Sequence, residues 1–190
     1  NILSLDLKKI AEALKTHPWV EEVTLRRVLP QRLEIQVKEY EPMALAYLPA
    51  PPVGGPDGGK ARLGELYYVS KHGKIFKKVA PYESLNYPVI TGLDNIAQPR
   101  WKASINKALE IIHLAQTEGS LSLGKLSEVH IDERYGLSLF TAGSPTQIRF
   151  GYDDFLRKWE RLKAVFSYLG KGMDNLRYID LNYRDRAIVG

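Results

Sequence analysis

Residues 18–42, with the sequence PWVEEVTLRRVLPQRLEIQVKEYEP, decide the fold of the first part of the chain. Pro18 ends any helix that precedes it, because proline lacks the backbone N–H that a helix interior needs. The segment RLEIQVKE alternates apolar and polar residues, which is the period of a half-buried strand. Leu29–Pro30 supplies a turn signal in the middle. The stretch therefore predicts a hairpin of two strands, the first starting near Val20.

A helix is predicted immediately before this hairpin. Ser4 is a suitable N-cap, since a serine hydroxyl accepts a hydrogen bond from the free N–H groups of the first turn. Apolar residues then recur at helical spacing and form one face, made of Leu7, Ile10, Ala11 and Leu14. We expect this face to pack on the two strands that follow.

Residues 49–63, PAPPVGGPDGGKARL, are rich in proline and glycine. This composition predicts a flexible surface insertion rather than a domain boundary, because almost none of these residues is able to pack in a core. Part of the insertion, GGPDGGK, has the spacing of a phosphate-binding P-loop. Ala61 follows the lysine where a P-loop needs a hydroxyl to hold magnesium, and prolines replace the preceding strand, so nucleotide binding is not predicted.

Beyond Leu66 the sequence consists mostly of short strand-like segments, at 67–70, 75–76, 128–132, 137–140 and 147–150. Two helices, at about 102–116 and 153–169, interrupt them, and each carries one apolar stripe. Asp153 or Asp154 would cap the second helix, whose stripe comprises Phe155, Leu156, Trp159, Leu162, Val165, Phe166 and Leu169. The pattern predicts a twisted, mostly antiparallel sheet with helices on one side, in the α+β class.

The last residues, YIDLNYRDRAIVG at 178–190, predict a second hairpin. Ile179, Leu181 and Tyr183 alternate with more polar residues in a first strand, RDR forms a turn, and AIV forms a second strand. We expect this second strand to be an open edge of the sheet. Such an edge exposes unpaired N–H and C=O groups, which proteins either blunt or use to receive a strand from a partner.

Composition excludes several classes of function. The chain is 44% hydrophobic but has no run of about 18 apolar residues, which predicts a folded core without a membrane span. It has no cysteine, its four histidines are scattered, and no serine has a partnered base, so we expect no metal, no cofactor and no catalysis. The net charge of +5 is spread over many segments, which favours a mildly basic surface over a nucleic-acid site.

The motifs and their order resemble the FtsQ/DivIB family of bacterial cell-division proteins. The matching positions of the first part are Asn1, Ile2, Asp6, Pro18, Trp19, Val20, Arg27, Pro30, Leu33, Ile35, Val37, Glu39 and Pro42. Further matches are YVSKHGKIF at 68–76, YPVITGL at 87–93 and the hairpin at 178–189. The resemblance covers nearly the whole chain in the family's order.

This resemblance implies a partial POTRA domain over residues 1–42, with a helix, short strands and its first strand missing, followed by a β domain over residues 43–190. In the family, a cytoplasmic tail, one transmembrane helix and the first POTRA strand precede this point. The chain is therefore expected to be the extracytoplasmic, periplasmic part of a single-pass inner-membrane protein at the division septum.

The resemblance also implies a non-enzymatic scaffold of the divisome. Its partners would be the bitopic division proteins FtsB and FtsL, and upstream division proteins bound through the POTRA domain. A strand of FtsB would add to the last strand of the sheet, linking early division proteins to septal peptidoglycan synthesis. The implied contact residues are Tyr152, Tyr183, Asp185, Arg186, Ala187, Ile188, Val189 and Gly190.

Some positions depart from the family, and two other functions stay open at this point. Tyr152 stands where well-known members carry a basic residue, and Asn182 replaces a common arginine, so the charge pairing with the partner is not defined. One alternative is a POTRA module that receives polypeptide in outer-membrane assembly or secretion. The other is direct binding of an anionic wall polymer, which a steep loss of binding with salt would reveal.

Overall fold

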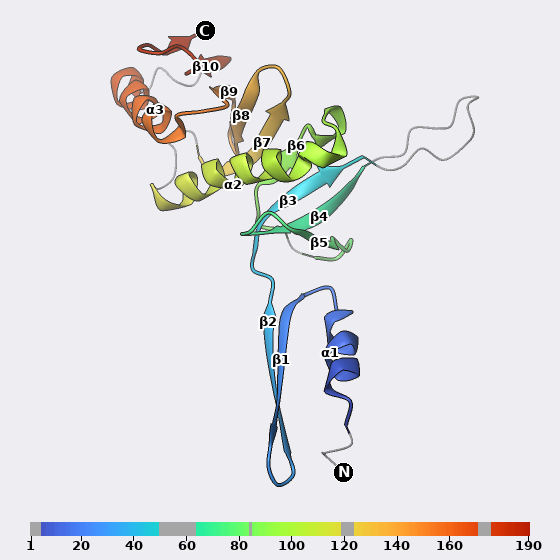
Figure 1. Ribbon diagram of the computed structural model, residues 1–190. Coiled ribbons are helices and arrows are strands. Elements are labelled where there is room, and N and C mark those ends of the chain that lie inside the picture. Colours follow the sequence, from blue (N-terminus) through green and yellow to red (C-terminus); the bar gives the residue numbers. More distant parts are fainter. Residues whose placement is uncertain (1–4, 50–63, 84, 119–123, 171–175) are drawn as a thin grey trace, which may run out of the picture. The chain divides into compact units, whose positions relative to one another are not determined.

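The computed structural model describes residues 5–49, 64–83, 85–118, 124–170 and 176–190 (Figure 1). The predicted cap Ser4 and nearly all of the predicted insertion at 49–63 lie outside these residues. The chain divides into two compact units, Asn1–Pro42 and Met43–Gly190. None of the described helices has both the length and the apolar character that crossing a bilayer requires.

The first unit begins with helix α1, Leu7–Lys15. Asp6 is its N-cap, because its carboxylate accepts hydrogen bonds from the backbone N–H groups of Lys8 and Lys9 at 3.1 and 3.2 Å. The helix ends before Pro18, as predicted. Its apolar residues are half-buried, since α1 packs on one strand of the hairpin that follows.

That hairpin consists of β1, Val20–Val28, and β2, Arg32–Glu39, paired antiparallel. The register places Val23 opposite Val37 and Leu25 opposite Ile35, so the apolar residues of both strands share one face. Ile35 and Val37 remain 47% exposed, because α1 packs mainly on β1. The predicted helix and hairpin of this unit are therefore confirmed.

The second unit is built on one nine-stranded sheet, with the order β11-β10-β9-β8-β7-β6-β3-β4-β5. Its strands are β3 Pro42–Leu48, β4 Glu65–Ser70, β5 Ile75–Lys78, β6 Val89–Thr91, β7 Leu126–Asp132, β8 Gly136–Thr141, β9 Ser144–Gly151, β10 Tyr178–Asp180 and β11 Ile188–Val189. Short 3₁₀ helices, Leu93–Asn95 and Gln98–Arg100, follow β6. The α+β class is confirmed.

The sheet is mixed, and among its described strand pairs the antiparallel ones outnumber the parallel ones. The pairs β4–β5, β7–β8, β8–β9 and β10–β11 are antiparallel, as short connections require. The pairs β3–β6, β6–β7 and β9–β10 are parallel. In two of the parallel pairs a helix lies in the connection, α2, Trp101–Thr117, between β6 and β7, and α3, Phe155–Leu169, between β9 and β10.

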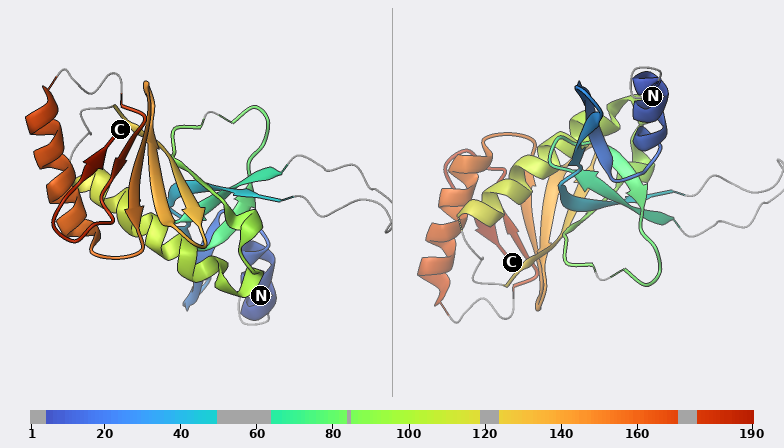
Figure 2. Two further views of the ribbon diagram at one scale, coloured as in Figure 1. Left: turned by 90° about the horizontal axis from the view of Figure 1, so that it is seen from above. Right: turned by 90° about the horizontal axis from the view of Figure 1, so that it is seen from below.

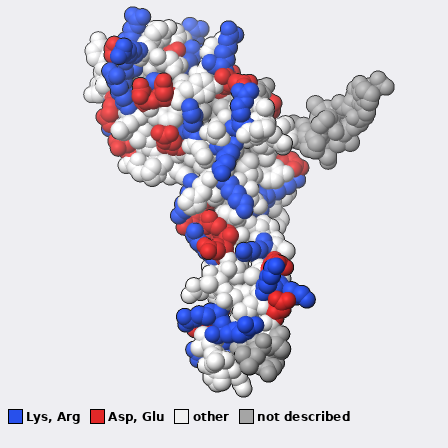
Figure 3. Space-filling view, viewed as in Figure 1, with Lys and Arg blue, Asp and Glu red and all other residues white. Residues whose placement is uncertain are grey.

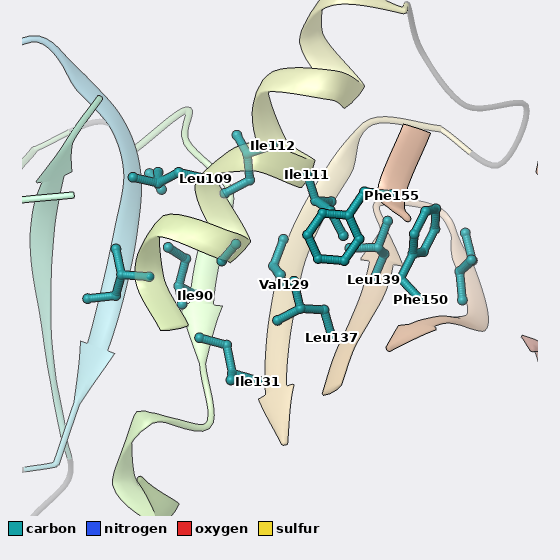
Figure 4. Packing of buried hydrophobic residues seen from close by; sticks show 14 of the residues in the cluster. Ile90, Leu109, Ile111, Ile112, Val129, Ile131, Leu137, Leu139, Phe150 and Phe155 are labelled. Carbon is teal, nitrogen blue, oxygen red and sulfur yellow. The ribbon is translucent and has the colours of Figure 1, made fainter. Parts of the chain in front are cut away.

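Helices α2 and α3 pack on the same face of the sheet. Val129, Leu139, Ile148 and Ile179 are neighbours across four strands, and all are fully buried on that face. Helix α2 runs across the sheet and α3 lies beside β10 (Figures 1 and 2). Side chains from α2 and from the strands meet in this core (Figure 4), and the buried residues of α2 are Ile105, Ala108, Leu109, Ile111 and Ile112.

Helix α3 corrects two details of the predicted second helix. Leu156, which the apolar stripe placed in the core, is 61% exposed, whereas Phe155, Trp159, Leu162 and Phe166 are buried as predicted. Neither aspartate caps the helix with its side chain: Asp154 occupies the N-cap position with a positive φ of 50° and makes no capping bond. The carboxylate of Asp153 binds Lys158 instead.

The ends of β8 and β9 approach so closely that only glycine fits there. Gly136 has a φ of +83°, and a Cβ added to it would lie 2.3 Å from the carbonyl carbon of Gly151. Gly143, in the turn between the same strands, has a φ of +99° with nothing within 4 Å of an added Cβ. Alanine at Gly143 would therefore be destabilising only through its positive φ, whereas alanine at Gly136 would add a steric clash.

We predict that Gly136→Ala destabilises the chain much more than Gly143→Ala. Gly143→Ala should lower the free energy of unfolding by about 1–2 kcal/mol, the cost of a positive φ for a residue with a Cβ. Gly136→Ala adds a clash with backbone atoms and should cost at least about 3 kcal/mol in total. Urea denaturation of both variants measures the difference, and equal losses would contradict the close approach of β8 and β9.

Candidate functional site

The last strand, β11, pairs with β10 and has no neighbour on its other side within the described parts of the chain. The register places Val189 opposite Ile179 and Ile188 opposite Asp180. Beyond the strand, the backbone N–H of Gly190 donates to the carbonyl oxygen of Tyr178 at 3.2 Å, and the N–H of Tyr178 donates to the oxygen of Gly190 at 3.1 Å. Gly190 and Tyr178 are therefore a hydrogen-bonded pair.

This pairing determines where the backbone groups of β11 point. In an antiparallel ladder, hydrogen-bonded pairs alternate with pairs that exchange no bonds. Since Gly190 bonds to Tyr178, Ile188 bonds to β10 as well, and Val189 between them does not. The N–H and C=O of Val189 therefore point away from β10, toward the open side of the sheet. We call residues 187–190 the partner edge.

Strand β10, which holds the partner edge, is anchored in the core. Ile179 and Leu181 are fully buried, and the N–H of Leu181 donates to the carbonyl of Arg149 in β9 at 2.9 Å. On the other face of the sheet, the guanidinium of Arg149 lies 4.6 Å from the ring centroid of Tyr178 and 3.8 Å from the carboxylate of Asp180. The partner edge is thus attached to a strand that is fixed from both faces.

Residues 181–187 connect β10 to β11, and we call residues 181–186, which precede the partner edge, the closing loop. The sequence placed Tyr183 in the strand, but β10 ends at Asp180, so Tyr183 lies in the closing loop and is 43% exposed. The guanidinium of Arg161 in α3 donates to carbonyl oxygens along this loop: from Nη1 to Leu181 (3.2 Å), Tyr183 (2.6 Å) and Arg186 (3.5 Å), and from Nη2 to Arg184 (2.5 Å). Sequence reasoning missed this residue.

The surface around the partner edge is rich in arginine. Arg157 of α3 pairs with Asp185 at 3.2 Å, and Arg186 lies 5.1 Å from the ring centroid of Tyr183. Lys163 on the same helix donates to Glu160 and Glu118, and these hydrogen bonds raise the pKa of its ammonium. On the face shown in Figure 3, Lys and Arg side chains are interspersed with Asp and Glu, so they form no single-sign surface.

An open groove of about 380 Å³ lies between the second half of α3 and the hairpin, directly beside the partner edge. We call it the α3 groove. Its exposed residues include Tyr168, which is 91% exposed, and Val189, which is 41% exposed. Its walls are formed by Arg161, Ala164, Val165, Tyr168 and Leu169 of α3 and by Asp185, Arg186, Ala187 and Val189 of the hairpin.

Tyr152 makes its contacts away from the closing hairpin. Its hydroxyl donates to the carbonyl of Asp132, and Lys107 of α2 donates to the carbonyl of Tyr152 at 3.0 Å with its Nζ 5.2 Å from the ring centroid. Burial, followed by the negative charges of Asp132 and Glu133, raises the pKa of Tyr152. The residue lines a separate groove of about 290 Å³ between α2 and the β7–β8 turn. The structure therefore brings together all of the predicted contact residues except Tyr152.

Lys158 is a further residue that the sequence did not single out. Lysine is rarely buried, but Lys158, a residue of α3, is only 6% exposed. Its Nζ donates to the carbonyl of Phe150 at 2.8 Å and to the carboxylate of Asp153 at 2.7 Å. That hydrogen bond and the positive charge of Lys158 lower the pKa of Asp153. Lys158 therefore connects α3 to the end of β9 through Phe150 and to the segment between the two elements through Asp153.

Across the residues that the structure describes, no group of three or more histidine, cysteine, aspartate or glutamate side chains is placed to hold a metal ion. The candidate binding features of the second unit are the partner edge, the closing loop, the α3 groove and the groove at Tyr152.

Comparison with known proteins assigns both units. Residues 1–40 match the family model "POTRA domain, FtsQ-type", and residues 60–182 match the model "Cell division protein FtsQ/DivIB, C-terminal". Curated relatives are cell division proteins FtsQ. The chain is 33% identical over 192 residues to that of Geotalea daltonii, 34% over 193 residues to that of Geobacter sp. (strain M21), and 29% over 193 residues to that of Syntrophotalea carbinolica.

These alignments cover 99%, 100% and 100% of this chain, but 64%, 65% and 63% of the respective relatives. The chain thus spans somewhat less than two thirds of the length of the curated relatives. The two family models cover α1, the β1–β2 hairpin, α2, α3 and the strands β4 to β10, whereas β3 and β11 lie outside the matched residues.

The Lys158–Asp153 pair predicts a defined response to acid. Because the folded-state pKa of Asp153 is lowered, the pair contributes stability above the ordinary aspartate pKa of about 3.9, and this is lost as pH falls through the folded pKa. Asp153→Asn should cost about 0.5–1 kcal/mol at pH 7, a small value because the carboxylate is largely exposed. It should also remove part of the stability loss between pH 7 and about pH 3.

Asp154→Asn is the matched control, because the adjacent Asp154 makes no capping bond. Chemical denaturation at both pH values measures the effect. The control should keep the acid response of the wild-type chain. An acid response that is the same in Asp153→Asn and in the control would show that the Lys158 pair does not contribute.

Proposed function

The chain belongs to the FtsQ/DivIB family of cell division proteins, and on that premise we propose that it is a non-enzymatic divisome scaffold that binds FtsB and FtsL. The proposed mechanism is strand addition, in which a strand of FtsB pairs with the partner edge. The protein would thereby link early division proteins to septal peptidoglycan synthesis.

The observation that carries this proposal is the outward direction of the Val189 backbone groups at the end of the sheet. Added strands gain affinity from exactly such main-chain hydrogen bonds. Proteins usually protect an open edge with lysine, proline or an inward charge, whereas the partner edge has the sequence AIVG and carries none of these. An unprotected edge is consistent with a strand that is covered in the functional state.

The α3 groove would make binding selective for the sequence of the partner strand, in addition to contributing affinity. Val189 lies on the same face of the sheet as Ile179, which is the face that α3 covers. Side chains of an added strand alternate between the two faces, so every second one would point toward α3. Those side chains would contact Val189 and Tyr168, and this contact would favour apolar residues at alternate positions of the FtsB strand.

The arginines beside the partner edge favour a partner segment with acidic residues. Arg184 and Arg186 flank Asp185, the acidic residue of the closing loop, which is already paired with Arg157. Acidic side chains next to the added strand would pair with the guanidinium groups of the closing loop, which speeds association and selects register. In this respect the arginines of the closing loop would take the role of the arginine that Asn182 replaces.

The remaining roles are part of the same proposal. The POTRA-type unit would recruit upstream division proteins, and the groove at Tyr152 would form a second contact with the partner. The chain would be the periplasmic part of a single-pass inner-membrane protein at the septum. Membership of a cell-division family supports this reading over polypeptide transfer in outer-membrane assembly, and the interspersed charges in Figure 3 support it over an anionic wall polymer.

We predict that Val189→Pro weakens binding of the extracytoplasmic FtsB segment at least about tenfold, because proline removes the outward N–H and obstructs pairing. The fold should be retained, since that N–H makes no bond to β10. Val189→Ala is the matched control: it shortens the side chain but keeps the N–H. Isothermal titration of the two folded variants measures the backbone contribution.

Ile188→Pro is a control in which proline is expected to damage the fold itself. Its N–H belongs to a hydrogen-bonded pair with Asp180, so proline there should break the β10–β11 hairpin itself. Circular dichroism and denaturation identify that damage. Binding of wild-type strength by folded Val189→Pro would contradict strand addition at this edge.

A further inference from the structure

We infer that Arg161 is a positioning residue for the partner edge: its guanidinium holds the closing loop in the conformation that presents β11 to a partner strand. This inference rests on the proposed function and adds a residue to it that lies on α3, outside the hairpin. The observation behind it is the set of carbonyl contacts made by one side chain along the loop.

The contacts span almost the whole closing loop. Nη1 bonds to the oxygens of Leu181 and Tyr183 and reaches that of Arg186, and Nη2 bonds to that of Arg184. Leu181 is fully buried and directly follows β10, while Arg186 is two residues before β11. The guanidinium therefore links the residue that follows β10 to the residues just before β11 through a single rigid group.

The loop needs such a group because its own secondary structure is minimal. Residues 181–187 contain neither helix nor strand, and β11 is only two residues long. A strand this short has few ladder bonds with which to maintain its place. Carbonyl groups that point inward from a loop also need donors, and a guanidinium offers five N–H groups in a fixed plane. A lysine ammonium offers three donors around one point, so it would not span the same set of oxygens.

Loop order bears directly on affinity. If only a fraction of the molecules holds the loop in the competent form, the apparent dissociation constant rises by the inverse of that fraction. A wild-type chain with a fixed loop avoids this loss. Arg161 also lines the α3 groove, so its effect on the free chain must be separated from any direct contact with a partner.

The test compares Arg161→Gln and Arg161→Lys with Arg157→Gln. Arg157 is the matched control because it also reaches the closing loop from α3, but through one exposed ion pair with Asp185. In the free chain, both Arg161 variants should speed amide exchange at Tyr178 and Gly190, which pair across the hairpin, by about tenfold. Exchange in α2 and β7 should stay unchanged, whereas a loss of global stability would accelerate it there too.

The same proteins are then titrated with the extracytoplasmic FtsB segment. We expect affinity to fall about tenfold in Arg161→Gln and Arg161→Lys, and to change less than about threefold in Arg157→Gln. Arg161→Gly leaves space for a free ion, so millimolar guanidinium, far below denaturing concentrations, should restore both slow exchange and binding in that variant. Rescue of this kind would not follow from a general loss of packing.

The outcomes separate this inference from the proposed function. If the wild-type chain binds and the Arg161 variants bind equally well with unchanged exchange at Gly190, the positioning role is wrong and strand addition stands. If exchange rises but affinity does not change, Arg161 orders the loop without serving the partner, which also overturns the inference. If the wild-type chain itself does not bind the FtsB segment, the proposed function is wrong, and so is this inference, which rests on it.

Discussion

Burial of Ile179 and Leu181 beneath α3 is the interaction on which the rest of the candidate site depends. These two side chains fix β10 in parallel with β9, and β10 in turn fixes the only partner of β11 among the described strands. Once β10 is placed, the alternation of an antiparallel ladder leaves the backbone of Val189 with no bond to its neighbour. The availability of this edge is therefore a consequence of core packing and not a separate local feature.

Much of this arrangement is readable from the sequence, because it rests on short-range periodicity. The alternation in RLEIQVKE predicts β2, and the stripe that contains Trp159 and Phe166 predicts α3 and its buried face. The final hairpin follows from the same reasoning, since a charged RDR turn separates two apolar segments. The family resemblance then orders these elements, and the family models matched by residues 1–40 and 60–182 agree with it.

Other features depend on contacts between distant residues, which periodicity does not encode. Three strand pairs are parallel, and the sequence of a strand carries no mark of its neighbour's direction. Arg161 looks like any exposed helix arginine until the carbonyls of the closing loop are in place around it. The resemblance implies that Tyr152 contacts the partner, and the structure places its bonds to Asp132 and Lys107 at a groove separate from the closing hairpin.

The central claim is that the outward backbone of β11 receives a strand, and residue-resolved amide exchange tests it most directly. An isotope-labelled chain would be measured alone and with the extracytoplasmic FtsB segment in excess. The account predicts that exchange of the Val189 amide slows strongly on binding, whereas Gly190, already bonded to Tyr178, changes far less. Binding that leaves Val189 unprotected, or that protects residues only around Tyr152, would contradict it.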